Sequence, residues 1–177
     1  MKNKILLWQL IGFAFVSVLG TLLHFLYEWT DGNVIIATIS GVNESTWEHM
    51  KLLFFPLALF IIIEKRHIDS KNFFFIKLCG IIIGLILIPV LFYTLNGAFG
   101  KTSDWLNISI FYISAAVVFA VEYYLFKRLK RDLGLNVLSV IAILVTAISF
   151  VLFTFYPPEI PLFLDPITNG YGIQLSN

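Results

Sequence analysis

Five residues of this 177-residue chain have the types and spacing of a chemical site. His24 and Glu28 are four residues apart, which places an imidazole and a carboxylate one turn apart on the same helix face. Further along, Glu44, Glu48 and His49 supply two more carboxylates and a second imidazole. Two imidazoles with several carboxylates are the ligand set that proteins use for zinc, manganese or non-haem iron. The pattern therefore predicts a divalent metal site, with zinc as the expected ion.

These residues divide into expected roles. A metal in such a site activates water, so hydrolysis is the expected reaction class. On an ideal helix His49 points about 100° away from Glu48, so Glu44, Glu48 and His49 converge on one ion only if the helix begins at or after Glu44. The expected metal ligands are His24, Glu28, Glu48 and His49, and Glu44 is expected to act beside them as an acid or general base. The expected substrate contacts are Asn43, Trp47 and Lys51, with Lys51 attracting an anionic group.

A second interpretation of the same residues needs no metal. Ser45 and Glu48 have the spacing of a capping box, and Lys51 is placed to pair with Glu48 one turn later. His24 and Glu28 would then form an ordinary hydrogen-bonding network between helices. Against this, a cap does not need two histidines, and ionisable groups near the hydrocarbon boundary are costly enough to suggest a function. The sequence leaves both interpretations open.

The elements that must position these residues are membrane helices. Hydrophobic residues make up 59% of the chain and charged residues 13%, and the mean hydropathy is +0.89, which excludes an ordinary soluble domain. The net charge is +1 and the basic residues form short clusters beside apolar segments, so there is no footprint for nucleic acid. The expected fold class is all-α, a single domain over residues 1–177 with transmembrane helices at about 5–29, 46–63, 73–93, 105–125 and 137–155.

Two segments outside these helices are also apolar. Residues 34–39, between the first two helices, are too short to cross a bilayer and predict a re-entrant or interfacial segment. The tail, residues 156–177, contains four prolines that prevent a regular helix, yet it is too apolar for a freely solvated segment. We expect the tail to pack down, either as a lid over the outer mouth of the bundle or flat on the lipid surface.

Two further features of the membrane segments are expected to serve packing. Glu122 lies toward the inner end of the fourth helix, five residues before Lys127, and is expected to pair or snorkel there. Gly80 and Gly84 in the third helix have the spacing that permits close approach between two helix backbones.

The basic residues predict the orientation. The amino terminus and alternate connections carry nine Lys and Arg residues, against two on the other side. Because basic loops stay in the cytoplasm, we expect the amino terminus inside, the carboxyl terminus outside after five crossings, and the candidate site at the outer surface. The nine are Lys2, Lys4, Lys65, Arg66, Lys71, Lys127, Arg128, Lys130 and Arg131, and the two are Lys51 and Lys101.

The run from Val42 to Leu52, VNESTWEHMKL, preceded by HFLYEW at 24–29, resembles an uncharacterised family of small bacterial multi-pass membrane proteins. The resemblance covers most of the chain, including the Pro-rich outer segment. It implies a membrane fold and a location in the bacterial cytoplasmic membrane, and it implies no activity.

Three functions fit these observations. The first is a metal-dependent hydrolase acting on a membrane-embedded or lipid-linked substrate at the outer leaflet. The second is a small-solute binding or transport subunit without catalysis. The third is a structural membrane protein whose polar cluster only caps and packs helices. The expected partners are the lipid bilayer and a lipid or small-molecule ligand.

Overall fold

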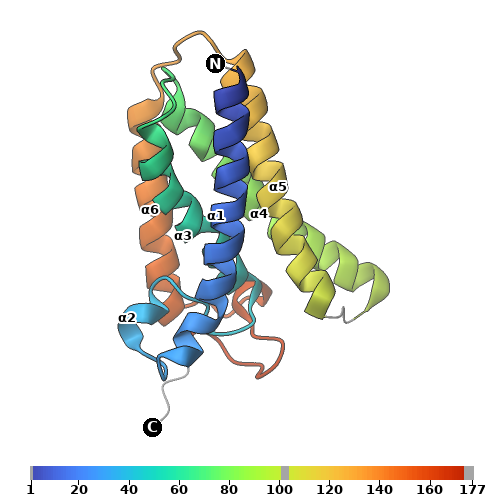
Figure 1. Ribbon diagram of the computed structural model, residues 1–177. Helices are drawn as coiled ribbons and strands as arrows, with labels where there is room; N and C mark the ends of the chain where they lie inside the picture. Colours follow the sequence, from blue (N-terminus) through green and yellow to red (C-terminus); the bar gives the residue numbers. More distant parts are fainter. Residues whose placement is uncertain (1, 101–103, 174–177) are drawn as a thin grey trace.

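The computed structural model describes residues 2–100 and 104–173, and over these residues the chain is helical without a β-sheet (Figure 1). Five of the helices are long and apolar enough to cross a membrane, which confirms the predicted fold class. Lys101, one of the two basic residues expected on the outer side, and the tail beyond residue 173 lie outside the described residues. The helices are α1 (Lys2–Trp29), α2 (Val34–Ala37), α3 (Thr46–Lys65), α4 (Phe73–Phe99), α5 (Asp104–Arg128) and α6 (Asn136–Phe155), followed by the 3-10 helix η1 (Pro161–Phe163).

The five long helices begin within three residues of the predicted positions, and the largest difference is at the end of α4. This helix continues six residues past the predicted end at Tyr93, as far as Phe99. The intervening residues contain no proline, and the Asn96 side chain donates to the carbonyl of Phe92 at 2.8 Å within the helix. A drop in hydropathy marks where a segment leaves the bilayer, but it does not by itself end a helix.

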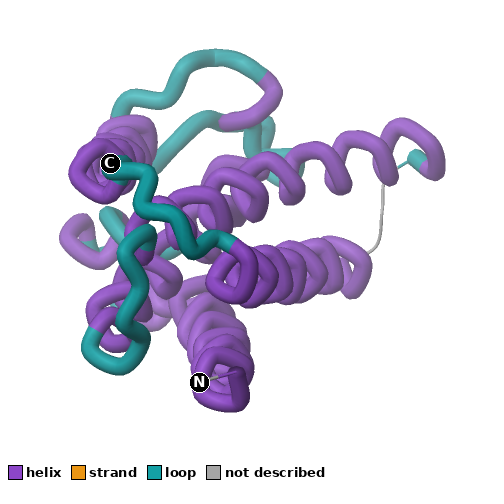
Figure 2. The backbone as a smooth tube through the Cα atoms, turned by 90° about the horizontal axis from the view of Figure 1, so that it is seen from above, coloured by secondary structure: helices purple, strands orange, loops and turns teal. Residues whose placement is uncertain are grey.

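Helix α3 lies at the centre of the bundle and contacts all four other long helices. Its apolar residues point in every direction, and a larger share of α3 is buried inside the bundle than of any other candidate membrane span in the described residues. Leu53, Phe54 and Leu57 on α3 are fully buried, and Phe60 is nearly so. The halves of α4 and α5 farthest from the start of α1 pair with each other and lean away from α1, as the side view and the end-on view both show (Figures 1 and 2).

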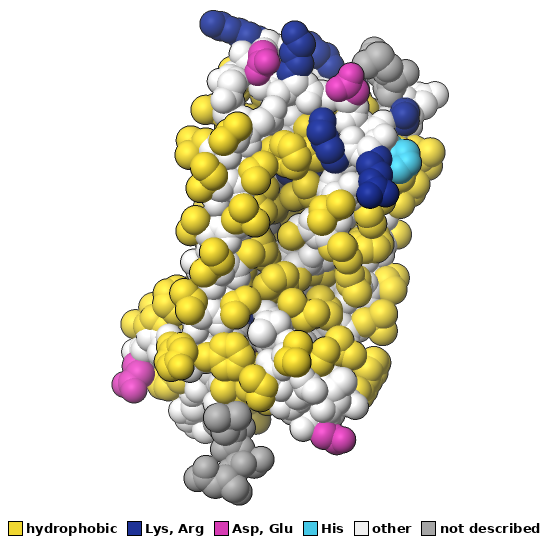
Figure 3. All heavy atoms as spheres, turned by 90° about the vertical axis from the view of Figure 1, so that its left-hand side faces the viewer, with side chains coloured by type: hydrophobic (Ala, Val, Ile, Leu, Met, Phe, Trp, Pro, Cys, Tyr) yellow, Lys and Arg dark blue, Asp and Glu magenta, His cyan; other side chains and the backbone are white. Residues whose placement is uncertain are grey.

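The outer surface of the bundle is apolar. Large side chains such as Leu10, Val18, Ile62 and Val137 are more than half exposed, as expected of residues that face lipid chains. Figure 3 shows this apolar band and, at the end where α1 begins, a concentration of Lys and Arg. The chain is therefore a multi-pass membrane protein. We refer to the end where α1 begins as the basic end and to the other as the opposite end.

The segment between α1 and α3 forms the short surface helix α2 at the opposite end. The Asn33 side chain accepts from the N–H groups of Ile35 and Ile36 at 2.9 and 3.3 Å and so caps α2. Ile35 is 78% exposed, whereas Ala37 is buried. The segment is therefore a single helical turn with one buried and one exposed side, and its predicted re-entrant or interfacial position in the bilayer stays a prediction.

The Pro-rich tail folds back onto the same end of the bundle. Phe163 in η1 is buried and lies against Trp47 of α3, with ring centroids 4.7 Å apart. Beyond it, the N–H of Asp165 donates to the carbonyl of Gly170 at 3.0 Å, and Asn169 adopts a φ of 56° in the turn between them. The tail is therefore packed down, as its apolar residues predict.

Candidate metal centre

The start of α3 sets the positions of the candidate ligands. Ser45 is the N-cap residue, and its hydroxyl accepts from the N–H of Glu48 at 3.4 Å. The Ser45 N–H pairs with the side-chain oxygen of Asn43 at 2.9 Å, so Glu48 does not return to it and only half of the predicted capping box forms. Because α3 begins at Thr46, Glu44 precedes the helix, and its side chain is free to turn toward His49.

Three side chains from separate parts of the chain meet at this end. Nε2 of His24, on α1, is 3.7 Å from one carboxylate oxygen of Glu44, and Nε2 of His49, on α3, is 3.5 Å from the other. One ligand atom from each of the three residues lies within 4.8 Å of the others. Ligands about 2.0–2.2 Å from a tetrahedral zinc ion are about 3.3–3.6 Å from one another. The two histidine–carboxylate distances are thus close to this spacing, and the three ligand atoms together are within 4.8 Å. We call them the His24–Glu44–His49 cluster.

A backbone contact orients the His49 ring for metal binding. Its Nδ1 atom is 3.0 Å from the carbonyl oxygen of Ser45, which fits an N–H at Nδ1 donating to that oxygen. The lone pair then lies on Nε2, the atom that faces Glu44. Metal-ligating histidines commonly donate their second ring N–H to a carbonyl or carboxylate in this way.

The cluster lies where two cavities meet. Their volumes are about 360 and 340 Å³, and both are lined by Glu44, His49, Asn107, Phe111 and Ile167. Ile167 belongs to the tail, so the tail covers part of this space. The first cavity extends between α3, α4 and α5 along Thr46, Ile88, Phe92, Asn96, Ile110 and Pro166, and the second extends between α1 and α5 along Gly20, Thr21, His24, Phe25, Leu52, Ile108 and Tyr112.

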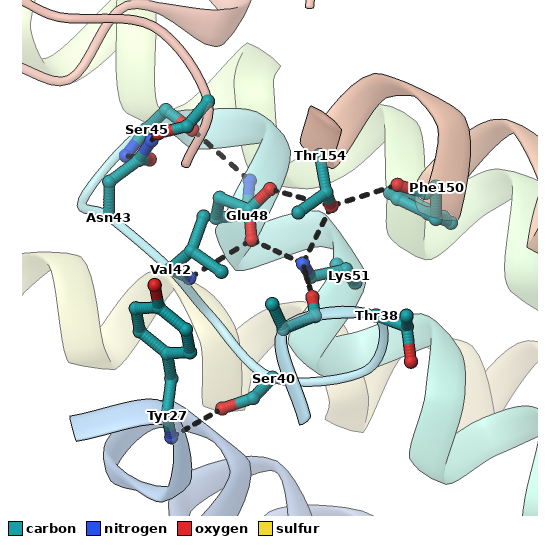
Figure 4. A network of polar contacts seen from close by, with 12 residues as sticks. Tyr27, Thr38, Ser40, Val42, Asn43, Ser45, Glu48, Lys51, Phe150 and Thr154 are labelled. Carbon is teal, nitrogen blue, oxygen red and sulfur yellow. Dashed lines mark hydrogen bonds and ion pairs between the residues drawn. The ribbon is translucent and has the colours of Figure 1, made fainter. Parts of the chain in front are cut away.

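Glu48 and Lys51 lie away from the cluster, in a separate buried network (Figure 4). The Lys51 ammonium is 2.5 Å from a Glu48 carboxylate oxygen. It also donates to the carbonyl of Ala37 at 2.9 Å and to the hydroxyl of Thr154, on α6, at 2.8 Å. The Val42 N–H completes the network by donating to Glu48 at 3.1 Å. Lys51 is fully buried, so this network joins α2, α3 and α6, and neither charged group faces the cavities.

The remaining candidate residues have structural contacts. Asn43 donates from its amide to the carbonyl of Gly172 at 2.9 Å and so ties the tail to the start of α3. Trp47 packs against Phe150 of α6, with ring centroids 4.5 Å apart. Glu28 lies one turn beyond His24 on α1 and is not among the three residues that converge. Of the predicted ligands, the structure brings together His24 and His49, and Glu44 takes the third position.

Sequence reasoning missed polar groups at both ends of the bundle. At the opposite end, sequence reasoning did not identify Thr21 as a cavity residue. Its hydroxyl is 3.0 Å from that of Tyr112, and both residues line the second cavity.

At the basic end, the expected pairing of Glu122 with Lys127 is wrong. Glu122 is 2.5 Å from Lys77 of α4, and Lys127 lies by the hydroxyl of Tyr123. Lys77 interrupts an otherwise apolar segment, and that is the signal that could have identified it.

Comparisons with curated proteins and with solved structures find no match to this chain. A family model, by contrast, covers residues 1–173, which is nearly the whole sequence. The matched region includes the His24–Glu44–His49 cluster, both cavities and the tail segment that covers them. The chain belongs to a family of unknown function (DUF6512).

Proposed function

We propose that this protein is a metal-dependent membrane hydrolase that binds one divalent ion, with zinc as the expected metal, at His24, Glu44 and His49. The observation that carries the proposal is the convergence of two imidazoles and one carboxylate on the wall of a cavity, with His49 held by the Ser45 carbonyl. Two histidines with one glutamate form a known catalytic zinc set, which leaves a coordination position for water or substrate.

The protein residues have distinct tasks in such a site. The ion supplies Lewis acidity and lowers the pKa of a bound water. Glu44 brings a negative charge to the two imidazoles and so favours cation binding. Asn107, on the wall shared by both cavities, is placed to orient a polar substrate group. The hydroxyl pair of Thr21 and Tyr112 offers a second polar contact on the α1–α5 side.

The cavity walls favour a substrate that is embedded in the membrane. Apart from the polar cluster, Asn107 and the hydroxyls of Thr21 and Tyr112, the second cavity is lined by apolar side chains, most of them on α1 and α5. Phe25 and Ile108, on those two helices, are 42% and 55% exposed at the surface that would face lipid. A substrate with a polar group at the cluster and an apolar chain between α1 and α5 matches this arrangement. We therefore propose a lipid or lipid-linked substrate.

The same proposal includes the orientation in the membrane. The concentration of Lys and Arg at the basic end supports a cytoplasmic location for that end. The His24–Glu44–His49 cluster would then lie at the outer leaflet of a bacterial cytoplasmic membrane. Reporter fusions in the connection between α3 and α4 and at the carboxyl terminus should report opposite sides, and a report of the same side from both would contradict the orientation.

The metal content of the purified protein tests the proposed function. The protein in detergent should bind one zinc ion per chain. After equilibration with zinc and removal of free zinc by desalting, elemental mass spectrometry would measure the bound zinc. His24→Ala and His49→Ala should each abolish stoichiometric binding. His67→Ala is the matched control, because His67 lies at the basic end, stacked on Trp8 at 4.0 Å, and should bind as wild type. A folded wild-type protein that binds no zinc, manganese or iron would overturn the proposal.

A further inference from the structure

Four of the five long helices contribute to a second buried polar cluster, near the basic end. The Lys77 ammonium of α4 is 2.8 Å from Glu64 of α3 and 2.5 Å from Glu122 of α5. The Gln9 amide of α1 donates to the second oxygen of Glu64 at 2.6 Å. Lys77 and both glutamates are fully buried, and Gln9 is 3% exposed. We call these four residues the inner cluster. It shares no residue with the cavities around the His24–Glu44–His49 cluster.

The formal charges of the inner cluster do not balance. One ammonium faces two carboxylates, so full ionisation would leave a net charge of −1 in the bundle interior. Phe60 and Phe119 flank the ammonium, with ring centroids 5.6 and 5.3 Å from it, and they provide no compensating cation. An uncompensated charge in such surroundings costs several kcal/mol, and a buried group normally becomes neutral instead.

The hydrogen bonds identify which carboxyl group is neutral. Both oxygens of Glu64 accept from donors, one from Gln9 and one from Lys77. Glu122 accepts from Lys77 at one oxygen, whereas its Oε1 is buried and has no hydrogen-bond partner among the described residues. An ionised oxygen without a donor is much more costly than a neutral hydroxyl in the same place. The excess proton therefore belongs on Glu122.

The helix packing around Glu122 leaves no room for a bulkier neighbour. A Cβ atom added at Gly80 of α4 would be 2.5 Å from Oε1 of Glu122. Gly80 thus makes room for a carboxyl side chain, whereas its spacing with Gly84 predicts the close approach of a helix backbone. The Cys79 thiol, also on α4, is within electrostatic range of Glu122, and a neutral thiol adds no positive charge.

We propose that Glu122 is a proton-binding site, so that the inner cluster at neutral pH consists of ionised Glu64, ionised Lys77 and protonated Glu122. The cluster is then neutral overall, and it holds α1, α3, α4 and α5 together around one exchangeable proton. Loss of that proton would leave two carboxylates competing for one ammonium.

Infrared spectroscopy of the intact protein tests the proposal directly. At neutral pH the wild-type protein should show a carbonyl stretching band of a protonated carboxyl group, shifted to lower frequency in heavy water. The band should be lost in Glu122→Gln and retained in the control Glu159→Gln, which changes an exposed carboxylate in the tail. Absence of the band from the wild type, or its persistence in Glu122→Gln, would overturn the proposal.

Thermal unfolding in detergent gives a second, independent measurement. Glutamine replaces a neutral carboxyl group almost isosterically, so Glu122→Gln should leave the melting temperature close to that of wild type. Glu64→Gln should lower it clearly, because Glu122 would then have to ionise to neutralise Lys77, and its buried Oε1 would carry charge without a hydrogen-bond donor. Equal losses in the two variants would show that both carboxylates are ionised and would overturn the assignment. The inner-cluster variants should still bind zinc, so failure here is distinguishable from failure of the proposed metal site.

Discussion

The two faces at the start of α3 carry similar residues in opposite environments. Glu44 and His49 lie on the cavity side, where their side chains are 40% and 24% exposed. Glu48 and Lys51 lie on the side that packs against α2 and α6, where they are 2% and 0% exposed. A carboxylate beside a basic group forms an open cluster on one face and a sealed ion pair on the other. Accessibility, and not residue type, separates the candidate binding site from the structural contact.

The charged groups of the sealed face pair closely with one another, whereas on the open face the two Nε2 atoms stay farther from the Glu44 carboxylate. Lys51 pairs with Glu48, Thr154 and a backbone carbonyl, so no donor capacity is left for a ligand. His24 and His49 instead face one shared carboxylate, at distances too long for direct hydrogen bonds. The comparison predicts that substitutions on the sealed face change stability, and that substitutions on the open face change binding.

The largest expected effect on stability is that of Lys51→Met. This change leaves the Glu48 carboxylate buried without its partner, which costs about 3–5 kcal/mol. Chemical or thermal unfolding in detergent would measure the loss. The double variant Lys51→Met with Glu48→Gln is the control, because it removes the uncompensated charge and should recover part of the stability. A single variant as stable as wild type would show that the pair does not hold α3, α2 and α6 together.

A smaller loss is expected where α1 crosses α5 next to the open face. In Gly20→Ala the new Cβ would be 2.5 Å from the Phe111 ring and 2.9 Å from the backbone oxygen of Leu52. Overpacking of this kind costs about 1–3 kcal/mol, and displacement of Phe111 should also weaken binding in the cavities. Gly97→Ala is the matched control in α4, since no atom lies within 4 Å of its added Cβ. Equal stability of the two variants would contradict the close packing.

The smallest expected loss is that of Ser45→Ala. This substitution removes the hydroxyl that accepts from the Glu48 N–H at the start of α3. Loss of such a cap costs about 1 kcal/mol. The carbonyl of Ser45, which orients His49, is kept, so zinc affinity should change little. Ser109→Ala, which removes a hydroxyl in the second turn of α5 that donates to the carbonyl of Trp105, is the control and should be neutral. A large loss of zinc binding in Ser45→Ala would show that the cap also shapes the site.

Hydropathy predicts the fold well because each span must satisfy its backbone hydrogen bonds internally, and helices are the simplest solution. The candidate site is only partly predictable. His24 and His49 follow from the spacing of polar residues near two helix ends. The position of Glu44, and not Glu48, beside the two histidines does not, because it depends on α3 beginning at Thr46, after the Ser45 cap. The contacts of Lys77 with Glu64 and Glu122 could not be predicted from local spacing, since 13 and 45 residues separate the partners along the chain.

The most direct test of the metal-binding claim compares the zinc affinities of Glu44→Gln and Glu48→Gln by competition with a chromogenic chelator. Glu44→Gln removes a proposed ligand and should weaken zinc binding by more than the roughly 10–100-fold that the loss of an outer contact to a ligand causes. It should leave the unfolding transition unchanged, since the Glu44 side chain is 40% exposed. Glu48→Gln should retain zinc binding and lose stability. The reverse result, with zinc lost in Glu48→Gln and kept in Glu44→Gln, would contradict the assignment of the site.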